Sequence, residues 1–183
     1  MKVIPSKLEG VTILEPQSFG DHRGYFMEIF QARRYAEAGV DRRFVQDNLS
    51  FSVRNTLRGL HYQYPNGQAK LVQAITGEIF DVAVDVRWGS PTFGQWEGVL
   101  LSAGNRRQLF IPEGFAHGFC VLSDTAHFLY KCSEFYSPGD ERGVAWNDPE
   151  IAITWPIDAP ILSDRDRQFP ALGRIAAEYL PKI

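Results

Sequence analysis

The feature that most constrains the fold is a long succession of short apolar segments with turn residues between them. From Gly77 to Cys132, the turns GSPT, SAGN, PEG and SDT separate segments of strand length, with almost no helix-forming stretch among them. Short strands at this spacing are typical of antiparallel sandwiches and barrels, whereas a doubly wound sheet needs helical crossovers. The pattern therefore predicts an all-β, antiparallel jelly roll or β-sandwich.

Local patterns add one clear strand and a few short peripheral helices. In residues 77–87, GEIFDVAVDVR, apolar positions 80, 82, 84 and 86 alternate with charged positions 81, 85 and 87, which is the period of a half-buried strand. The segment QARRYAEAGV favours a short helix that ends at Gly39. Ser163 is predicted to cap a final short helix that runs through Arg174 to Leu180.

Composition narrows the classes of protein. A chain of 183 residues, 44% hydrophobic and 22% charged, fits a single globular domain over residues 1–183. The net charge of -3 predicts neither nucleic acid nor an anionic membrane as partner, so any anion site must be local. No apolar run reaches the length of a membrane span, and the start lacks the apolar core of a signal peptide, so we expect a cytoplasmic protein. Cys120 and Cys132 stand in apolar stretches and are expected to be buried, reduced thiols.

The stretch LRGLHYQYPNGQAK, residues 57–70, is the strongest candidate for a site. Its extended segments flank the turn signal PNG, which predicts a hairpin that brings His61 and Lys70 together. Lys70 shares a strand face with Val72 and Ala74, and an ammonium on an interior face needs an anionic partner or ligand. Taken alone, the histidine is better explained as a core side chain and the lysine equally well as an exposed one. Their proximity favours a functional site.

Arg58 poses a problem of strand geometry. It has the opposite strand parity to His61, so both side chains reach one cavity only if Gly59 marks a bulge or the strand edge. Arg23, Arg58 and Arg165 are suited to bidentate phosphate contacts, and Tyr136 to stacking on a base, although each alone fits an ordinary surface residue.

A second histidine raises the question of a metal. His117, in IPEGFAHGF, enters a strand after a turn and can face His61 in a jelly roll. Metal-binding cupins, which this pattern partly resembles, usually carry a His-x-His pair, a glutamate and a distant histidine, but position 63 here is Gln63. Two ligands are too few for a stable site, so we predict no metal and no cofactor.

Two further side chains have both a structural and a catalytic interpretation. Tyr130 alternates with Phe128 and is either a weak acid on an apolar wall or a core-filling aromatic. Asp166, in LSDRDR, fits a first-turn carboxylate at a helix N-terminus when it is taken alone.

Seven motifs in order, spread over most of the chain, resemble the dTDP-4-dehydrorhamnose 3,5-epimerase family, which are cupin-type jelly rolls. The motifs are DHRGYFMEIF, QDNLSFS, TLRGLHYQ, QAKLVQAITGEIFDVAVDVR, IPEGFAHGF, LYKCSEFYSPGDERGVAWNDP and ILSDRDR. The resemblance implies conversion of dTDP-4-dehydro-6-deoxy-D-glucose to dTDP-4-dehydro-L-rhamnose, by proton abstraction and inversion at C3 and C5. Abstraction beside the keto group creates an enolate, whose oxygen needs a cation or a hydrogen-bond donor.

The resemblance also implies a role for each site residue. His61 is expected to be the base, Asp166 to hold its ring, Lys70 to stabilise the enolate, and Tyr130 to return a proton from the opposite face. The expected substrate contacts are Arg23, Phe26, Glu28, Gln46, Asp47, Asn48, Arg58, His117, Glu141 and Arg165, with Tyr136 stacked on thymine. A homodimer is implied, in which the N-terminal strand that carries Arg23 completes the neighbour's site.

Two departures and several alternatives remain open at this point. Position 165 is Arg165 where lysine is usual, and Asn55-Thr56 stands where Gly-Val is common. The same base also serves a mono-epimerase or a ketoisomerase on a related sugar. A metal-dependent cupin and a non-catalytic sugar-binding jelly roll are the more distant alternatives.

Overall fold

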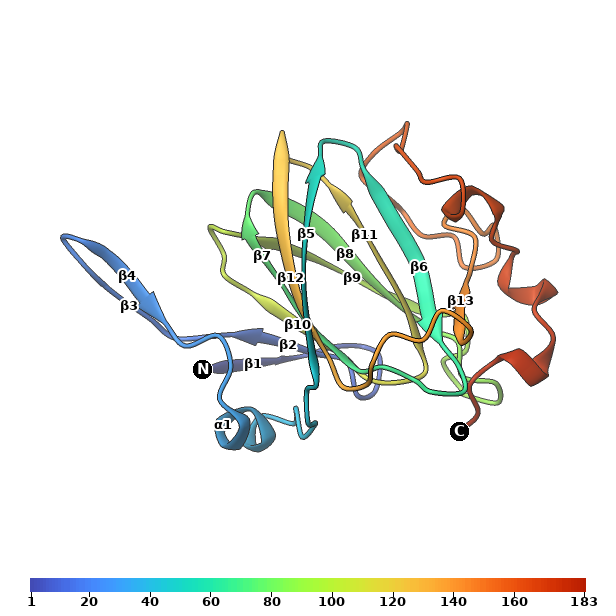
Figure 1. Cartoon of the computed structure of the whole chain (residues 1–183), viewed down its shortest axis with the longest axis horizontal. Coiled ribbons are helices and arrows are strands. Elements are labelled where there is room, and N and C mark those ends of the chain that lie inside the picture. The colour runs from blue at the N-terminus through green and yellow to red at the C-terminus, as the bar shows by residue number, and fades with distance from the viewer.

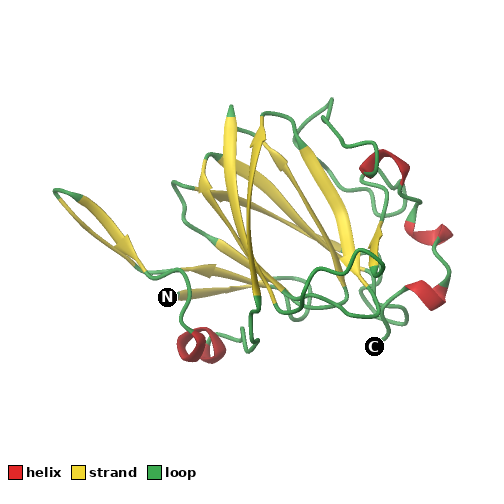
Figure 2. Ribbon diagram, viewed as in Figure 1, coloured by secondary structure: helices red, strands yellow, loops and turns green.

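Two antiparallel sheets, stacked face to face, make up the body of the computed structural model, which describes all residues 1–183 (Figures 1 and 2). The six-stranded sheet has the order β1 (Lys2–Pro5), β2 (Thr12–Glu15), β10 (Gln108–Ile111), β7 (Lys70–Thr76), β12 (Thr125–Cys132) and β5 (Gln46–Val53). The five-stranded sheet has the order β13 (Glu141–Gly143), β6 (Leu57–Gln63), β11 (Phe115–Val121), β8 (Glu78–Asp85) and β9 (Trp96–Ser102). The prediction of an all-β antiparallel sandwich is confirmed.

Three apolar clusters hold the layers together. The largest lies between the sheets and joins Val72 and Phe128 of one sheet to Ile79 and Phe119 of the other. A second cluster covers the outer face of the five-stranded sheet and includes Leu172 from the C-terminal segment. A third lies beneath the helix α1 (Ala32–Glu37) on the outer face of the six-stranded sheet. The middle strands are therefore covered on both faces.

This double covering corrects the prediction for residues 77–87. Strand β8 is almost wholly buried rather than half-buried, and the side chains of Asp81 and Asp85 are 0% exposed. The alternation marked two different buried environments, because the valines face the C-terminal segment while Ile79 and Ala83 face the sheet interior. Charged residues in such a strand need partners, since an unpaired buried charge is strongly unfavourable.

The helix predictions are half right. The helix α1 forms as predicted, with the Gln31 side chain accepting a hydrogen bond from the Arg34 N–H at 2.6 Å, and the chain leaves it at Gly39, whose φ is +91°. The predicted final helix is wrong, because the C-terminal segment forms three separate 3-10 turns: η1 (Asp166–Gln168), η2 (Leu172–Arg174) and η3 (Ala177–Tyr179). Pro170 disfavours a helical conformation in the residue before it, which divides the segment.

The predicted hairpin over residues 57–70 is also wrong. Strands β6 and β7 belong to different sheets, and residues 64–69 carry the chain from one sheet to the other. Gln63 stabilises this crossing, since its side-chain amide donates to the carbonyls of Asn66 and Phe135 and accepts from the Ser137 N–H. The turn signal marked a corner of the sandwich.

A separate hairpin of β3 (Ser18–Asp21) and β4 (Gly24–Met27) extends away from the sandwich (Figure 1). Its aromatic side chains are largely exposed, with Phe19 at 58%, Tyr25 at 56% and Phe26 at 69%. At its base, the Arg106 guanidinium stacks on the Tyr25 ring and donates to the Ser18 hydroxyl. Among the helices, none is long and apolar enough to cross a membrane.

Candidate active site

A cavity of about 600 Å³ opens between the two sheets and gathers most of the predicted site residues. It receives side chains from β5, β6, β7, β11 and β12 and from the C-terminal segment. The predicted residues in its lining are Gln46, Asn48, Arg58, His61, Lys70, His117, Tyr130, Tyr136, Glu141, Arg165 and Asp166.

Two residues of the predicted catalytic set, His61 and Asp166, are in direct contact in this cavity. The His61 Nε2 lies 2.6 Å from the Asp166 Oδ1, and the Asp166 side chain is only 6% exposed. Burial alone would raise the pKa of Asp166, but the hydrogen bond and charge of His61 and the Ser163 hydroxyl lower this pKa below its ordinary value. An ionised carboxylate can only accept a hydrogen bond, so Asp166 holds His61 with its proton on Nε2. The lone pair of the imidazole is then on Nδ1.

Gly59 solves the parity problem of Arg58. In the pairing of β6 with β11, His61 lies opposite His117 and Arg58 opposite Phe119, so three steps along β6 match two along β11. Of the two alternatives left open, a bulge or the strand edge, the structure has the bulge. Its φ is +123°, and a Cβ at this position would come within 2.5 Å of the Gly118 Cα, so only glycine fits without movement.

Lys70 lies at the end of β7 with no hydrogen bond or ion pair to its Nζ among the contacts of the structure. Its neighbours on the same strand face, Val72 and Ala74, are in the core between the sheets, as the alternation predicted. Burial lowers the pKa of the Lys70 ammonium, an effect that nearby Glu141 and Asp81 oppose. A desolvated ammonium that lines a cavity is suited to an anionic oxygen of a ligand.

Tyr130 of β12 lines the cavity beside Phe128, with ring centroids 5.6 Å apart. Burial raises the pKa of its phenol above the ordinary value, so the hydroxyl stays protonated near neutral pH. His61 comes from the five-stranded sheet and Tyr130 from the six-stranded sheet. A flat ligand between them would therefore have one residue near each face.

A second histidine–carboxylate pair was missed by sequence reasoning. The His117 Nε2 lies 3.1 and 3.0 Å from the two carboxylate oxygens of Asp81. Burial lowers the pKa of His117 and outweighs the opposing charge and hydrogen bond of Asp81, while the charge of Lys70 lowers this pKa further, so the imidazole is neutral at pH 7. The available signal was that Asp81 shares a strand face with Ile79, although the half-buried pattern itself favours exposure of the charged face.

The mouth of the cavity carries a polar cluster. The Glu141 carboxylate accepts a hydrogen bond from the Tyr136 hydroxyl and forms an ion pair with the Arg165 guanidinium. The Gln46 side chain accepts from the Tyr136 N–H at 3.0 Å, and its amide donates to the Asn48 side chain at 3.1 Å. These contacts join three distant parts of the sequence.

Four predicted residues lie outside this cavity. Arg23, Phe26 and Glu28 are in or next to the extended hairpin, where Arg23 pairs with Asp21. Asp47 points to the other face of β5, where its carboxylate binds the Lys131 Nζ at 2.9 Å. The lining also includes residues that were not predicted: Ser50, Gln68, Phe119, Phe128, Cys132 and Ser163.

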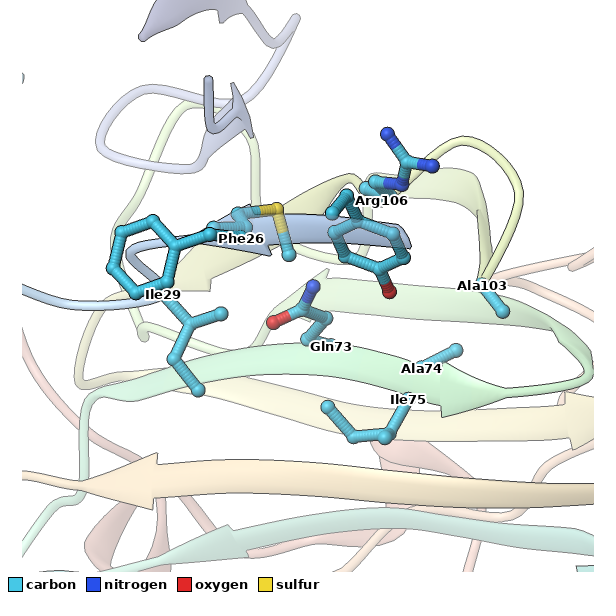
Figure 3. Close-up of a pocket in the computed structure, with 9 residues that line it drawn as sticks. Phe26, Ile29, Gln73, Ala74, Ile75, Ala103 and Arg106 are labelled. Carbon is cyan, nitrogen blue, oxygen red and sulfur yellow. The ribbon is translucent and has the colours of Figure 1, made fainter. Parts of the chain in front are cut away.

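A second cavity, of about 360 Å³, lies beneath the hairpin (Figure 3). Figure 3 shows Phe26 and Arg106 on one side of it and Gln73, Ala74 and Ile75 of β7 on the other. Its lining contains no histidine, lysine or carboxylate, whereas the cavity around His61 contains all three.

The two histidines are each engaged by an aspartate rather than directed at a common point. No group of three or more histidine, cysteine, aspartate or glutamate side chains has the arrangement of a metal site. Metal sites in proteins generally need at least three such ligands.

Comparison with known proteins assigns the family. The family described as dTDP-4-dehydrorhamnose 3,5-epimerase matches residues 5–174. The dTDP-4-dehydrorhamnose 3,5-epimerase of Shigella flexneri is 58% identical over 168 residues, which cover 91% of this chain and 93% of that protein. A dTDP-4-dehydrorhamnose 3-epimerase from Streptomyces niveus is 46% identical over 169 residues, with coverage of 91% and 82%.

Solved structures agree. The crystal structure of dTDP-6-deoxy-D-glucose-3,5-epimerase from Legionella pneumophila, in complex with dTDP-4-keto-L-rhamnose, superposes with a TM-score of 0.97 at 51% identity. The match covers 100% of this chain and 98% of that one. The residues matched by the family, the sequence identity and the coverage together show that the chain belongs to the dTDP-4-dehydrorhamnose 3,5-epimerase family.

Proposed function

We propose that the cavity around His61 converts dTDP-4-dehydro-6-deoxy-D-glucose to dTDP-4-dehydro-L-rhamnose by inverting C3 and C5. Membership of the family makes the chain an epimerase, an isomerase that acts on a nucleotide sugar. The observation that carries the assignment of residues is the 2.6 Å contact between His61 and Asp166 in a cavity that also holds Lys70 and Tyr130.

The first step is removal of a proton beside the C4 keto group. The Nδ1 lone pair of His61 takes the proton, and the C–H electrons form a C=C bond as the keto oxygen becomes an enolate. The Lys70 ammonium stabilises the negative oxygen, which is more effective in a desolvated site than in water. Asp166 fixes the tautomer and then stabilises the imidazolium.

The second step is return of a proton to the opposite face of the same carbon. The phenol of Tyr130 donates this proton, the C=C electrons form the new C–H bond, and the keto group is restored. His61 and Tyr130 stand on facing sheets, which supports inversion rather than return of the proton to its original face. The phenolate then recovers a proton from solvent and the imidazolium loses one.

The same cavity offers contacts for the rest of the substrate. The Nε2 of His117 is bound to Asp81, which leaves Nδ1 of this neutral imidazole, beside Lys70 in the lining, for a hydrogen bond with the sugar. Arg58 and Arg165 supply cations for the diphosphate, and Tyr136 supplies an aromatic face for thymine. Glu141, Gln46 and Asn48 hold this rim together through their own hydrogen bonds.

We propose further that two copies of the chain associate and that each extended hairpin completes the other copy's site. The exposed aromatic rings of Phe19, Tyr25 and Phe26 on the hairpin, and the exposed apolar side chains of Leu49 and Phe51 on β5, support an apolar interface. Arg23, Phe26 and Glu28, predicted to contact substrate, lie outside their own cavity. An exchange of hairpins in a two-fold dimer would account for both observations.

Deuterium incorporation tests the reaction directly. The purified protein is incubated with dTDP-4-dehydro-6-deoxyglucose in heavy water, and NMR locates the label. Label at both C3 and C5, absent in the His61→Asn variant, is the expected result. Label at C3 alone would indicate a mono-epimerase, the activity named for the Streptomyces niveus relative. No label on intact, bound substrate would indicate a binding protein.

A further inference from the structure

Phe169 connects the parts of the site that orient the base. Its ring lies against the His61 imidazole with centroids 5.6 Å apart and an interplanar angle of 72°, an edge-to-face arrangement. The Arg165 guanidinium lies over the same ring at 5.8 Å. Phe169 directly follows η1, which begins at Asp166. One short turn therefore supplies both the carboxylate that binds His61 and the ring that packs on it.

The position of the ring depends on Gly143. In the pairing of β13 with β6, Gly143 lies opposite His61. A Cβ on Gly143 would come within 2.5 Å of the Phe169 ring carbons, so the ring occupies the space that any larger residue would need. The absence of a side chain at this position lets the aromatic ring reach the imidazole.

Backbone contacts on both sides hold this segment in place. The Ala145 N–H donates to the Pro170 carbonyl at 2.8 Å, and the buried Asp148 carboxylate accepts from the Leu172 N–H at 2.6 Å. On its outer side, Phe169 borders an open groove of about 540 Å³ that Ile175 also lines. The ring is thus held by its contacts with His61 and Arg165 and through its backbone, while its outer side borders the groove.

We propose that Phe169 is a positioning residue for the base, whose ring sets the tilt of the His61 imidazole. The hydrogen bond to Asp166 fixes the distance of Nε2 from one oxygen, but a single hydrogen bond permits rotation of the ring plane about it. Contact with the Phe169 ring restricts that rotation and keeps the Nδ1 lone pair aimed into the cavity. The inference rests on the proposed function, in which His61 is the base.

Steady-state kinetics of Phe169→Ala give the first test. A misdirected lone pair slows proton abstraction, so kcat and deuterium exchange at both C3 and C5 are expected to fall about 10- to 100-fold. The KM should change far less than kcat, because Phe169 is absent from the lining of the substrate cavity and Arg165, which lies over the ring, keeps its ion pair with Glu141. Phe169→Leu restores apolar bulk beside His61 and is expected to recover most of the lost kcat.

Ile175→Ala is the matched control, since it truncates an apolar side chain in the same outer groove away from His61. It should lower the melting temperature without lowering kcat. Gly143→Ala tests the contact from the other side, because the new Cβ must displace the ring while Phe169 itself is retained. A folded Gly143→Ala variant with unchanged kcat would contradict the inference.

The NMR signals of the His61 ring nitrogens supply a readout that loss of stability alone does not change. Long-range proton–nitrogen NMR of protein labelled with ¹⁵N-histidine, with His61→Asn to assign the signals, should show protonated Nε2 and free Nδ1 in the unaltered protein. In Phe169→Ala the tautomer should persist, because Asp166 still holds Nε2, but these signals should broaden as the ring rotates about that hydrogen bond. If Phe169→Ala keeps both this signature and kcat, the positioning role is wrong although the proposed function stands. Full turnover by His61→Asn would instead overturn the proposed function.

Discussion

His61 and Tyr130 line one cavity from opposite sheets of the sandwich, the former on β6 and the latter on β12. In the proposed reaction, this relationship gives each face of the planar enolate its own residue. An enzyme that removes and returns protons with one residue would need no such opposition. The separation is what allows each proton transfer to be tested by a single substitution.

His61→Asn should abolish deuterium exchange at both C3 and C5, because the variant lacks the imidazole that Asp166 holds for proton abstraction. Tyr130→Phe should still release substrate protons, but inversion should fail to complete because the donor on the opposite face is gone. NMR of the substrate in heavy water separates the two outcomes. Full activity in His61→Asn would mean that the base is another residue.

Lys70→Met should separate activity from stability. Loss of the cation at the enolate oxygen is expected to lower kcat about 100- to 1000-fold, the usual effect of removing one stabilising donor. The Nζ is desolvated and has no ion-pair partner, so an isosteric apolar side chain should leave the melting temperature unchanged or raise it. Kinetics and thermal unfolding of the same preparation check both effects.

The alkaline stability profile gives an independent check on Lys70. Its folded-state pKa is lowered, so the unfolded chain binds more protons than the folded chain between the folded and unfolded pKa values. The free energy of unfolding should therefore rise with pH in that window, up to about pH 10, and this rise should be smaller in Lys70→Met. Identical profiles for the two proteins would argue that the ammonium is solvated.

Asp85→Asn should destabilise the fold without touching the active cavity. Burial would raise the pKa of Asp85, but hydrogen bonds from Arg87, Ser90 and Thr92 hold it below its ordinary value. Loss of these charge-assisted bonds is expected to lower the free energy of unfolding by about 1.5–3 kcal/mol at pH 7. A depressed folded-state pKa gives stability that is present above the unfolded pKa and lost on acidification. The difference between the two proteins should therefore shrink below about pH 4, as measured by urea unfolding.

Gly59→Ala should disrupt the site through the backbone. The residue needs a φ of +123°, and its new Cβ would meet the Gly118 Cα at 2.5 Å, so β6 and β11 must separate where His61 and His117 lie. The expected loss is more than about 2 kcal/mol of stability together with a large fall in kcat. Gly139→Ala is the control, because a Cβ there has no neighbour within 4 Å. Equal melting temperatures for the two variants would contradict the bulge argument.

The alternation of residues within a single strand predicted which side chains face the interior. The alternation in residues 70–74 placed Lys70 on the face of Val72 and Ala74, and the spacing of Tyr130 and Phe128 placed the phenol in the same interior. Both depend only on the two-residue repeat of a strand. The parity conflict of Arg58 even indicated the bulge at Gly59.

The pairing of strands that are distant in the chain could not be predicted from the sequence. The turn after β6 has the same residues whether it closes a hairpin or turns a corner between sheets, so the hairpin prediction failed although both side chains reach one cavity. The alternation in β8 favours solvent exposure for Asp81. A period of two does not reveal that the C-terminal segment covers the valine face of the strand, so that the face with Asp81 lies in the interior. The contact of Phe169 with His61 depends on the same covering and had no local signal.

Mixing two inactive variants provides a sharp test of hairpin exchange. If the hairpin serves the neighbouring copy, His61→Asn supplies an intact hairpin to a partner that carries Arg23→Ala but retains His61. A hybrid dimer then has one complete site and one doubly defective site, and random mixing should restore about a quarter of full activity. If each hairpin serves its own chain, mixing restores nothing.

Light scattering should give twice the 20.7 kDa of one chain for the unaltered protein. Phe26→Asp should weaken that dimer, since it places a charge on a side chain that is 69% exposed in one copy, whereas Ile183→Asp, at a comparably exposed C-terminal residue, should leave the mass unchanged.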